Sequence, residues 1–303
     1  SNRNVGKLLV QGLHKMEYRG YDSAGIALHQ NDHIAHLRTL GKVKLLEDKM
    51  IEEKPKSKLG IAHTRWATHG EPSEENAHPH KSNDRVYIVH NGIIENYLEL
   101  KEYLKTEDYS FSSQTDSELI AHMLDFFLNQ GNSMIDSMYL TKEKLDGAYA
   151  IAAVDKEDNS NIVLARNKSP LLIGIGTDEF LAASDPLAIG QLTNEFIFLE
   201  DGDVAKISAE DFVIYDSNKK EATREVTKID ISDQATSKGE YKHFMEKEIY
   251  EQPQAILNTI DGRVGGDDVL DNIFGLGSSE IFEKVKRIQV VACGTSLHAG
   301  RVA

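Results

Sequence analysis

The sequence predicts an α+β protein, and three observations support this class. Apolar residues recur at helical spacing in the first half of the chain, most clearly over residues 117–128. Between residues 148 and 215 the pattern changes to short apolar runs separated by turn residues, which is the spacing of an antiparallel sheet system. Residues 287–296 form an apolar run that opens into a small, hydroxyl-rich turn, as in a strand followed by a helix.

Length and charge narrow the classes of function. The 303 residues suffice for a sizeable core and about two domains. A net charge of −15 argues against a nucleic-acid or membrane-surface binder, because both partners are polyanionic. The single cysteine, Cys293, excludes an internal disulfide, and no run reaches the ~18 apolar residues of a spanning helix. No signal peptide is visible, so we expect a cytoplasmic protein that binds neither nucleic acid nor a membrane.

The helices are predicted from apolar stripes and from the residues that begin or end them. Asn4 is placed to cap the first helix, and Pro55 closes the second. A later helix is expected to be interrupted near Pro253. The predicted helices cover residues 4–17, 42–53, 94–104, 117–128, 133–145 and 241–260.

The strands are predicted from short apolar or alternating runs, and the one over residues 34–40 resembles an edge strand. A polar stretch over residues 217–240 has little to bury and is a plausible linker. The predicted strands cover residues 26–28, 34–40, 59–62, 86–92, 148–154, 162–165, 171–175, 180–183, 196–199, 204–207 and 212–215.

Residues 63–70 indicate a ligand site. This stretch places a guanidinium, an indole, a hydroxyl and an imidazole directly after an apolar strand, a variety that a packed core does not need. Arg65 offers a planar fork that fits a carboxylate, and Trp66 offers an apolar wall with one donor.

Asn91, Gly92 and Asp116 each allow two interpretations. The amide of Asn91 and the N–H of Gly92 could converge on one point, as donors to a tetrahedral oxyanion must. Alternatively, Asn-Gly is only a tight turn. Asp116 precedes a strongly amphipathic helix, so it is either the N-cap of that helix or a carboxylate that pairs with a ligand's ammonium group.

A cluster of histidines raises the question of a metal site. No cysteine or regularly spaced carboxylate completes a usual ligand set, so solvated or hydrogen-bonded imidazoles are expected instead of metal ligands. Cys293 is interpreted as a small buried residue and not as a nucleophile. The histidines are His63, His69, His78, His80 and His90.

Several motifs occur in order along nearly the whole chain. They are Tyr-Arg-Gly-Tyr-Asp-Ser-Ala-Gly at 18–25, His-Thr-Arg-Trp-Ala-Thr-His-Gly at 63–70, His-Asn-Gly-Ile-Ile-Glu-Asn at 90–96, Thr-Asp-Ser-Glu at 115–118, Glu-Lys-Glu-Ile-Tyr-Glu-Gln-Pro at 246–253 and Cys-Gly-Thr-Ser at 293–296. Together they resemble the glutamine-fructose-6-phosphate aminotransferase (glucosamine-6-phosphate synthase) family. The glutaminase-like motifs alone also fit amidophosphoribosyltransferase or asparagine synthetase, whereas the segments 246–253 and 293–296 resemble the sugar isomerase half of the aminotransferase specifically.

This resemblance implies a fold, a domain order and a reaction. Residues 1–216 would form a four-layer α/β/β/α N-terminal-nucleophile hydrolase sandwich that hydrolyses glutamine. Residues 217–240 would be the linker, and residues 241–303 would begin an α/β sugar isomerase (SIS) domain. The parent enzyme would pass the ammonia to fructose 6-phosphate, giving glucosamine 6-phosphate and glutamate. The resemblance implies no cofactor and no metal, and a homodimer or higher homo-oligomer.

The resemblance also implies roles for residues. Arg65 would bind the α-carboxylate of glutamine, and Asp116 its α-ammonium group. Asn91 and Gly92 would form the oxyanion hole, with Arg19 near the nucleophile. Trp66, Thr68 and His69 would line the glutamine pocket, and Thr295 and Ser296 would contact the sugar phosphate.

The chain departs from the family pattern at its first residue. The family nucleophile is an N-terminal cysteine whose own α-amine is its base, on a strand that should precede Ser1. Ser1 does not replace it, so we expect the chain as it stands to be inactive on glutamine. Most of the isomerase half is absent as well. Two alternatives stay open: another class 2 glutamine amidotransferase, or a nucleophile-free regulator that binds glutamine or a sugar phosphate.

Overall fold

The computed structural model describes residues 3–18, 20–30, 32–66, 70–229, 241–260, 264–265, 268–269, 278–292 and 294–302. The chain divides into two compact units, Ser1–Thr236 and Ser237–Ala303. Among the described residues, no helix has the length and apolar character needed to span a membrane.

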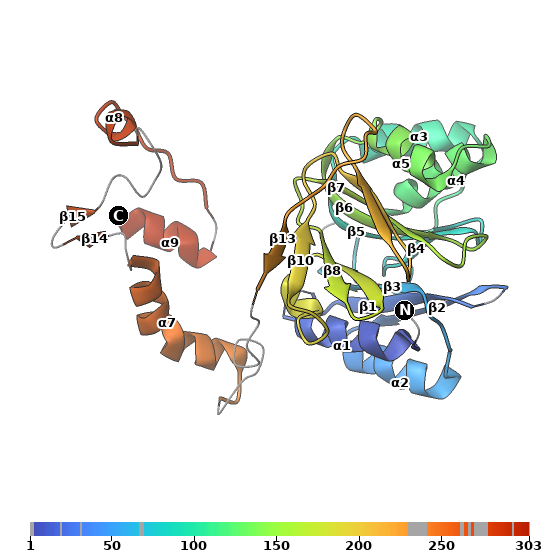
Figure 1. Ribbon diagram of the computed structural model, residues 1–303, viewed down its shortest axis with the longest axis horizontal. Coiled ribbons are helices and arrows are strands. Elements are labelled where there is room, and N and C mark those ends of the chain that lie inside the picture. The colour runs from blue at the N-terminus through green and yellow to red at the C-terminus, as the bar shows by residue number, and fades with distance from the viewer. Residues whose placement is uncertain are drawn as a thin grey trace. The chain divides into compact units, whose positions relative to one another are not determined.

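Two helices and a three-stranded sheet form one side of the first unit (Figure 1). Val10 and Leu13 of the first helix pack with Ile26 and Leu28 of the central strand, and Leu46 of the second helix completes this core. The elements are α1 (Gly6–Met16), β1 (Ser23–His29), β2 (Ile34–Leu40), α2 (Val43–Glu53) and β3 (Gly60–Arg65), and the sheet order is β2-β1-β3.

A six-stranded antiparallel sheet lies at the centre of the first unit, and three helices cover its outer face (Figure 1). Ile88 and Ile151 of the sheet are fully buried against Leu124 and Met138 of these helices. The strands are β4 (His80–Ser82), β5 (Val86–Ile94), β6 (Gly147–Asp155), β7 (Ile162–Asn167), β11 (Val204–Ile207) and β12 (Phe212–Tyr215), in the order β12-β11-β7-β6-β5-β4. The helices are α3 (Tyr97–Thr106), α4 (Glu118–Asn129) and α5 (Met134–Lys142).

A four-stranded sheet and the three-stranded sheet share the inner face of the six-stranded sheet. Ile173 and Ile197 pack against Leu164 of the six-stranded sheet, whereas Ile61 of the three-stranded sheet packs against Tyr87. The unit is therefore layered as helices, two sheets side by side, one sheet and helices, and the predicted α+β class is confirmed. The remaining elements are β8 (Leu172–Gly176), β9 (Glu179–Ala183), η1 (Pro186–Ala188), β10 (Glu195–Phe198) and β13 (Val226–Lys228), and the sheet order is β13-β10-β8-β9.

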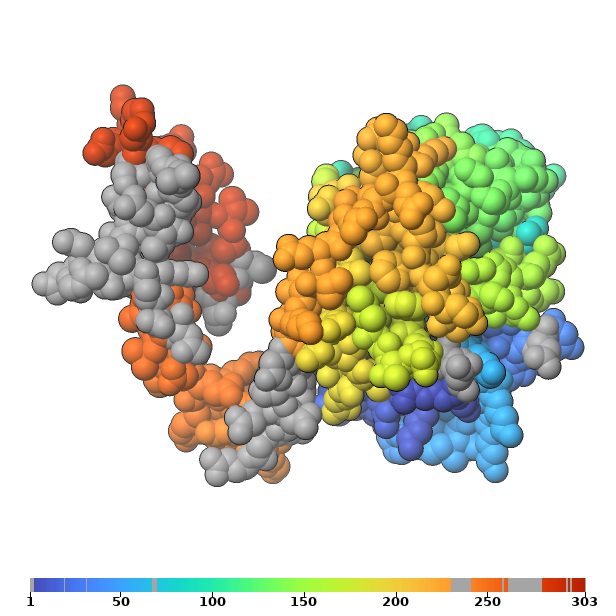
Figure 2. Space-filling view, viewed as in Figure 1, coloured from blue at the N-terminus to red at the C-terminus, as the bar shows by residue number. Residues whose placement is uncertain are grey.

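Part of the predicted linker belongs to the first unit. Strand β13 pairs with β10, and Arg224 donates two hydrogen bonds to the buried carboxylate of Asp203. Figure 2 shows the orange segment that leads to β13 lying against the body of this unit. The polar composition of residues 217–229 reflects an edge strand with three exposed residues and not a free connection.

Two local predictions in the first unit need adjustment. The cap position of α1 is Val5 and not Asn4, although the side chain of Asn4 accepts the N–H groups of Gly6 (3.4 Å) and Ser57 (3.2 Å). The strand predicted over residues 26–28 is longer, because Ser23 to Gly25 pair with β3 and β2.

The second unit contains α7 (Phe244–Ile260), β14 (Val264–Gly265), β15 (Asp268–Val269), α8 (Ser278–Phe282) and α9 (Gly294–Val302). Pro253 lies inside α7, so the predicted interruption there is wrong. Residues 287–292 are not in a strand, although α9 follows them as expected. The strand predicted ahead of the Cys-Gly-Thr-Ser turn is therefore absent from the described part of this unit.

Candidate functional site

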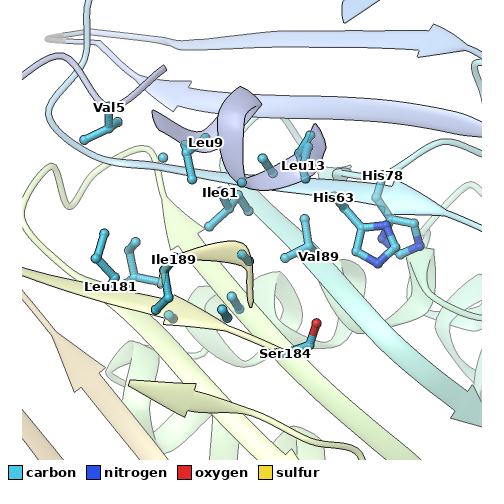
Figure 3. Close-up of a pocket in the computed structure, with 18 of the residues that line it drawn as sticks. Val5, Leu9, Leu13, Ile61, His63, His78, Val89, Leu181, Ser184 and Ile189 are labelled. Atoms are coloured by element: carbon cyan, nitrogen blue, oxygen red, sulfur yellow. The ribbon is translucent and has the colours of Figure 1, made fainter. Parts of the chain in front are cut away.

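A cavity of about 680 Å³ lies inside the first unit, between α1, the two inner sheets and the six-stranded sheet. Figure 3 shows side chains from α1, β3, β5 and β9 pointing into the same space. Most of the wall is apolar, with Leu9 and Leu13 on one side and Leu181 and Ile189 on another. Five of the ten site residues predicted from the sequence line it, namely Arg65, Trp66, Asn91, Gly92 and Asp116.

Arg65 is the last residue of β3, and only 5% of it is exposed. Its guanidinium donates to the carbonyl oxygens of Gly70 (3.2 Å) and Glu71 (3.4 Å), which fixes the side chain beside the loop that follows the strand. Burial lowers the pKa of Arg65, while the carboxylates of Asp22 and Asp116 oppose that shift. The buried guanidinium is thus fixed in position, and its charge and planar shape suit an anionic group.

Asn91 and Gly92 are not a turn. Both lie inside β5, paired with Ala150 and Tyr149 of β6, so the turn interpretation is wrong. Gly92 has φ +148°, and a Cβ there would collide with the carbonyl oxygen of Ala148. Only glycine fits this close approach of two strands. Asn91 and Gly92 therefore line the cavity and do not form a chain reversal.

Asp116 does not cap α4. The cap position is Ser117, which makes no capping bond, and the Oδ2 atom of Asp116 instead accepts the N–H of Ile94 (2.8 Å). Only 3% of Asp116 is exposed, and it lines the same cavity as Arg65. A buried carboxylate without a capping role leaves the ligand interpretation as the one that the geometry favours.

Four of the histidines noted in the sequence, His63, His78, His80 and His90, lie close together, and three of them, His63, His78 and His90, line the cavity. The rings of His63 and His78 have centroids 4.3 Å apart, and those of His78 and His80 are 4.6 Å apart. Burial lowers the pKa of His63 and of His80 to about 3, and that of His90 to about 4. Within the described ranges, no three His, Cys, Asp or Glu side chains are arranged to hold a metal ion.

Sequence reasoning missed the buried support of Asp116. The loop over residues 112–117 is held by Glu118, which accepts hydrogen bonds from Ser112 and Ser113, and by a contact of Thr115 with His80 (3.1 Å). The signal in the sequence was the run of short polar residues directly ahead of a strongly apolar helix. When such a run is buried, its polar groups must form hydrogen bonds with one another or with nearby residues.

Trp66 and Ser296 are exposed, and several other predicted site residues are not described by the structure. Trp66 is 57% exposed at its rim, with its ring 5.4 Å from that of Tyr21. Ser296 is exposed within α9. Arg19, Thr68, His69 and Cys293, and the side chain of Thr295, lie outside the described residues.

The glutamine amidotransferase domain family matches residues 63–191, which contain Arg65, Asn91, Gly92 and Asp116. This part of the chain is therefore similar to glutamine amidotransferase domains. Over its whole length it is 48% identical to the glutamine-fructose-6-phosphate aminotransferase (isomerizing) of Vibrio parahaemolyticus and 47% identical to that of Haemophilus influenzae. Each alignment covers 100% of this chain and 50% of the relative. The chain thus spans about half the length of the curated relatives it matches, and the resemblance to this family is confirmed.

Solved structures share the fold. The glutamine phosphoribosylpyrophosphate amidotransferase of B. subtilis, complexed with ADP and GMP, aligns with a TM-score of 0.59 at 22% identity, over 75% of this chain and 47% of that one. An allosteric regulatory enzyme of purine biosynthesis aligns with a TM-score of 0.58 at 24% identity, over 73% of this chain and 46% of the other. At these identities the similarity shows a shared α+β sandwich fold and nothing further.

Proposed function

We propose that the first unit hydrolyses glutamine to glutamate and ammonia when a strand led by a cysteine precedes it, and that the cavity holds the amino acid by both of its charged α-groups. The observation that carries this proposal is the pair Arg65 and Asp116, opposite charges that are both almost fully buried and both line the cavity. A free amino acid presents a carboxylate and an ammonium group a few ångströms apart. A site that matches both rejects ligands lacking either, because one buried charge would be left unpaired.

The reacting amide would lie beside Asn91 and Gly92. The side chain of Asn91 and the backbone N–H of Gly92 are neighbouring donors on the wall that carries Asp116. When a nucleophile attacks the amide carbon, the carbonyl oxygen gains negative charge, and two such donors stabilise that charge.

The cavity also supports a place for the nucleophile. In the described part of the chain, β3 pairs only with β1 and β9 pairs only with β8, so each presents an open edge. Both edges line the cavity, together with apolar residues of α1 above and β5 below. One apolar strand between them would join the three-stranded and four-stranded sheets into a single sheet.

The direction of such a strand follows from two contacts. Val5 donates to the carbonyl of Ser57, just ahead of β3, and Arg3 forms an ion pair with Glu179, at the start of β9. A strand that joins the chain ahead of Arg3 would therefore end near the first residues of β3 and β9. Its own first residue would lie at the opposite end, where Arg65 lies.

A cysteine at that first position would complete the reaction. Its α-amine would take the thiol proton, and the thiolate would attack the amide carbon of glutamine. The proton would pass to the leaving nitrogen, which departs as ammonia, and water would then hydrolyse the thioester to glutamate. Asn91 and Gly92 would hold the oxyanion in both halves.

The proposal for the whole protein follows its relatives. The ammonia would aminate fructose 6-phosphate, and the product would be glucosamine 6-phosphate. Thr295 and Ser296 are proposed as sugar-phosphate contacts in the isomerase part. A cytoplasmic homodimer or larger homo-oligomer without a cofactor completes this proposal.

The test places the proposed strand ahead of Ser1. The chain starting at Ser1 should release no ammonia from glutamine above the buffer rate. The extended chain, in which an apolar strand of about six residues led by cysteine precedes Ser1, should release ammonia. A matched extension led by alanine is the control and should be inactive. A folded but inactive cysteine-led protein would overturn the proposal, as would ammonia release by the chain starting at Ser1.

A further inference from the structure

Glu118 is an ionised carboxylate in a buried place. Only 3% of it is exposed, yet it accepts four hydrogen bonds, from the N–H and the hydroxyl of both Ser112 and Ser113, at 2.7 to 2.9 Å. Burial acts to raise the pKa of Glu118, but His122, whose Nε2 atom lies 3.7 Å from Glu118 Oε1, and the bonds from Ser112 and Ser113 hold it well below its ordinary value. The carboxylate is therefore ionised, and its hydrogen bonds hold residues 112–113 next to the start of α4.

Hydrogen bonds continue from this anchor to the residues on both sides of Asp116. The hydroxyl of Ser113 also contacts that of Thr115 (3.0 Å), and Thr115 contacts the Nε2 atom of His80 (3.1 Å). On the other side, Ser117 Oγ contacts His90 Nδ1 (2.8 Å) and donates to Asp116 Oδ1 (3.3 Å). Asp116 thus lies in a short loop fastened before and after it.

We propose that Glu118 is a positioning residue that sets the place of the Asp116 carboxylate, and so gives the site its preference for ligands with an α-ammonium group. This inference rests on the proposed function. Glu118 itself does not line the cavity, so it acts through the loop over residues 112–117.

An amide cannot replace this carboxylate. The side chain of glutamine has the same shape as that of glutamate, but only one of its two terminal atoms accepts hydrogen bonds. In Glu118→Gln the amide nitrogen would face the N–H of either Ser112 or Ser113, and a buried donor would lose its partner. Helix α4 begins at this residue and is held by its apolar face, so the loop is expected to move rather than the helix.

The chain offers two matched controls. Asp125 lies in the same helix, is 1% exposed, and accepts bonds from Asn83, Tyr109 and Asn129, none of them in the loop. Asp125→Asn thus disturbs a buried carboxylate of α4 away from the site. Glu99→Gln makes the same chemical change as Glu118→Gln in the first turn of α3, at an exposed position.

The experiment is calorimetric titration of glutamate and of glutarate, which lacks the amine, into this chain and its variants. Glu118→Gln should weaken glutamate binding by about tenfold or more and change glutarate binding little. Asp125→Asn should lower the melting temperature without changing either affinity, and Glu99→Gln should change nothing.

Each other outcome overturns a stated claim. If the parent chain binds glutamate but Glu118→Gln binds it equally well, or loses both ligands equally, the positioning role is refuted while the proposed function stands. If the parent chain does not bind glutamate, the proposed function fails and this inference with it. Should Glu118→Gln not fold, Ser113→Ala removes one bond to the anchor, and an unchanged glutamate-to-glutarate preference there refutes the inference.

Discussion

The two layers of sheet in the first unit differ in one respect that explains the site. The six-stranded sheet is continuous, whereas the layer facing it is divided into three and four strands. A fully buried core covers the helix side of the continuous sheet, and the cavity lies where the other layer is divided. The polar residues of the site gather at this division. The open edges of β3 and β9 at this division are where we propose that a cysteine-led strand completes the divided layer.

Asn91 lies in the continuous sheet and lines the cavity, and its substitution should have the largest effect. In the cysteine-led extended chain, Asn91→Ala should lower turnover about 10²- to 10³-fold, the usual cost of one oxyanion donor. Glutamate binding should change little, because glutamate has no reacting amide. Steady-state ammonia release measures the first effect, and a turnover within about threefold of the parent would exclude Asn91 from the oxyanion hole.

Neighbouring residues of β5 probe the two faces of the continuous sheet. Ile88 is fully buried in the core beneath the helices, whereas Val89 lines the cavity. Ile88→Ala should cost about 2–5 kcal/mol of unfolding free energy, since it leaves a hole in a packed core. Val89→Ala should cost about 1 kcal/mol or less, because the space beside it is already open. Urea denaturation of the chain measures both, and equal losses would mean that the cavity is packed in solution.

The divided layer also predicts a pH effect at His36 of β2. Burial lowers the pKa of His36 to about 4, and its Nε2 atom lies 2.9 Å from the carbonyl oxygen of Pro79. An unfolded histidine takes up its proton near pH 6.5, so the unfolded state binds more protons between about pH 6.5 and 4. Stability should fall as the pH drops through that window. In His36→Gln the side-chain amide can still donate to the carbonyl oxygen of Pro79, but it does not take up a proton in this pH range.

Melting temperatures of the parent and of His36→Gln at about pH 7 and about pH 5 test this expectation. The variant should lose fewer degrees than the parent between the two values. An equal loss in both proteins would show that His36 does not contribute, and that the other buried histidines account for the acid sensitivity.

The sequence predicted most elements of the first unit because its signals are local. The stripe of α4 and the strands from β6 to β12 follow from apolar periodicity alone. Arg65 was found because its chemistry stands out after an apolar strand. The local sequence could not decide between the two interpretations of Asn91 or of Asp116, because they differ only in tertiary contacts. Asn91 pairs with Ala150 of β6, and Asp116 accepts the N–H of Ile94. Strand β13 was missed because it is short and exposed.

The most direct test of the central claim is the affinity of Asp116→Asn for glutamate. Asparagine keeps the shape of the side chain and can still accept the N–H of Ile94, but it cannot neutralise an ammonium group. Calorimetric titration should show glutamate binding weakened by about 2 kcal/mol or more, with glutarate binding unchanged. Unchanged glutamate affinity together with an unchanged melting temperature would contradict the account of Arg65 and Asp116 as a matched pair for the two charges of an amino acid.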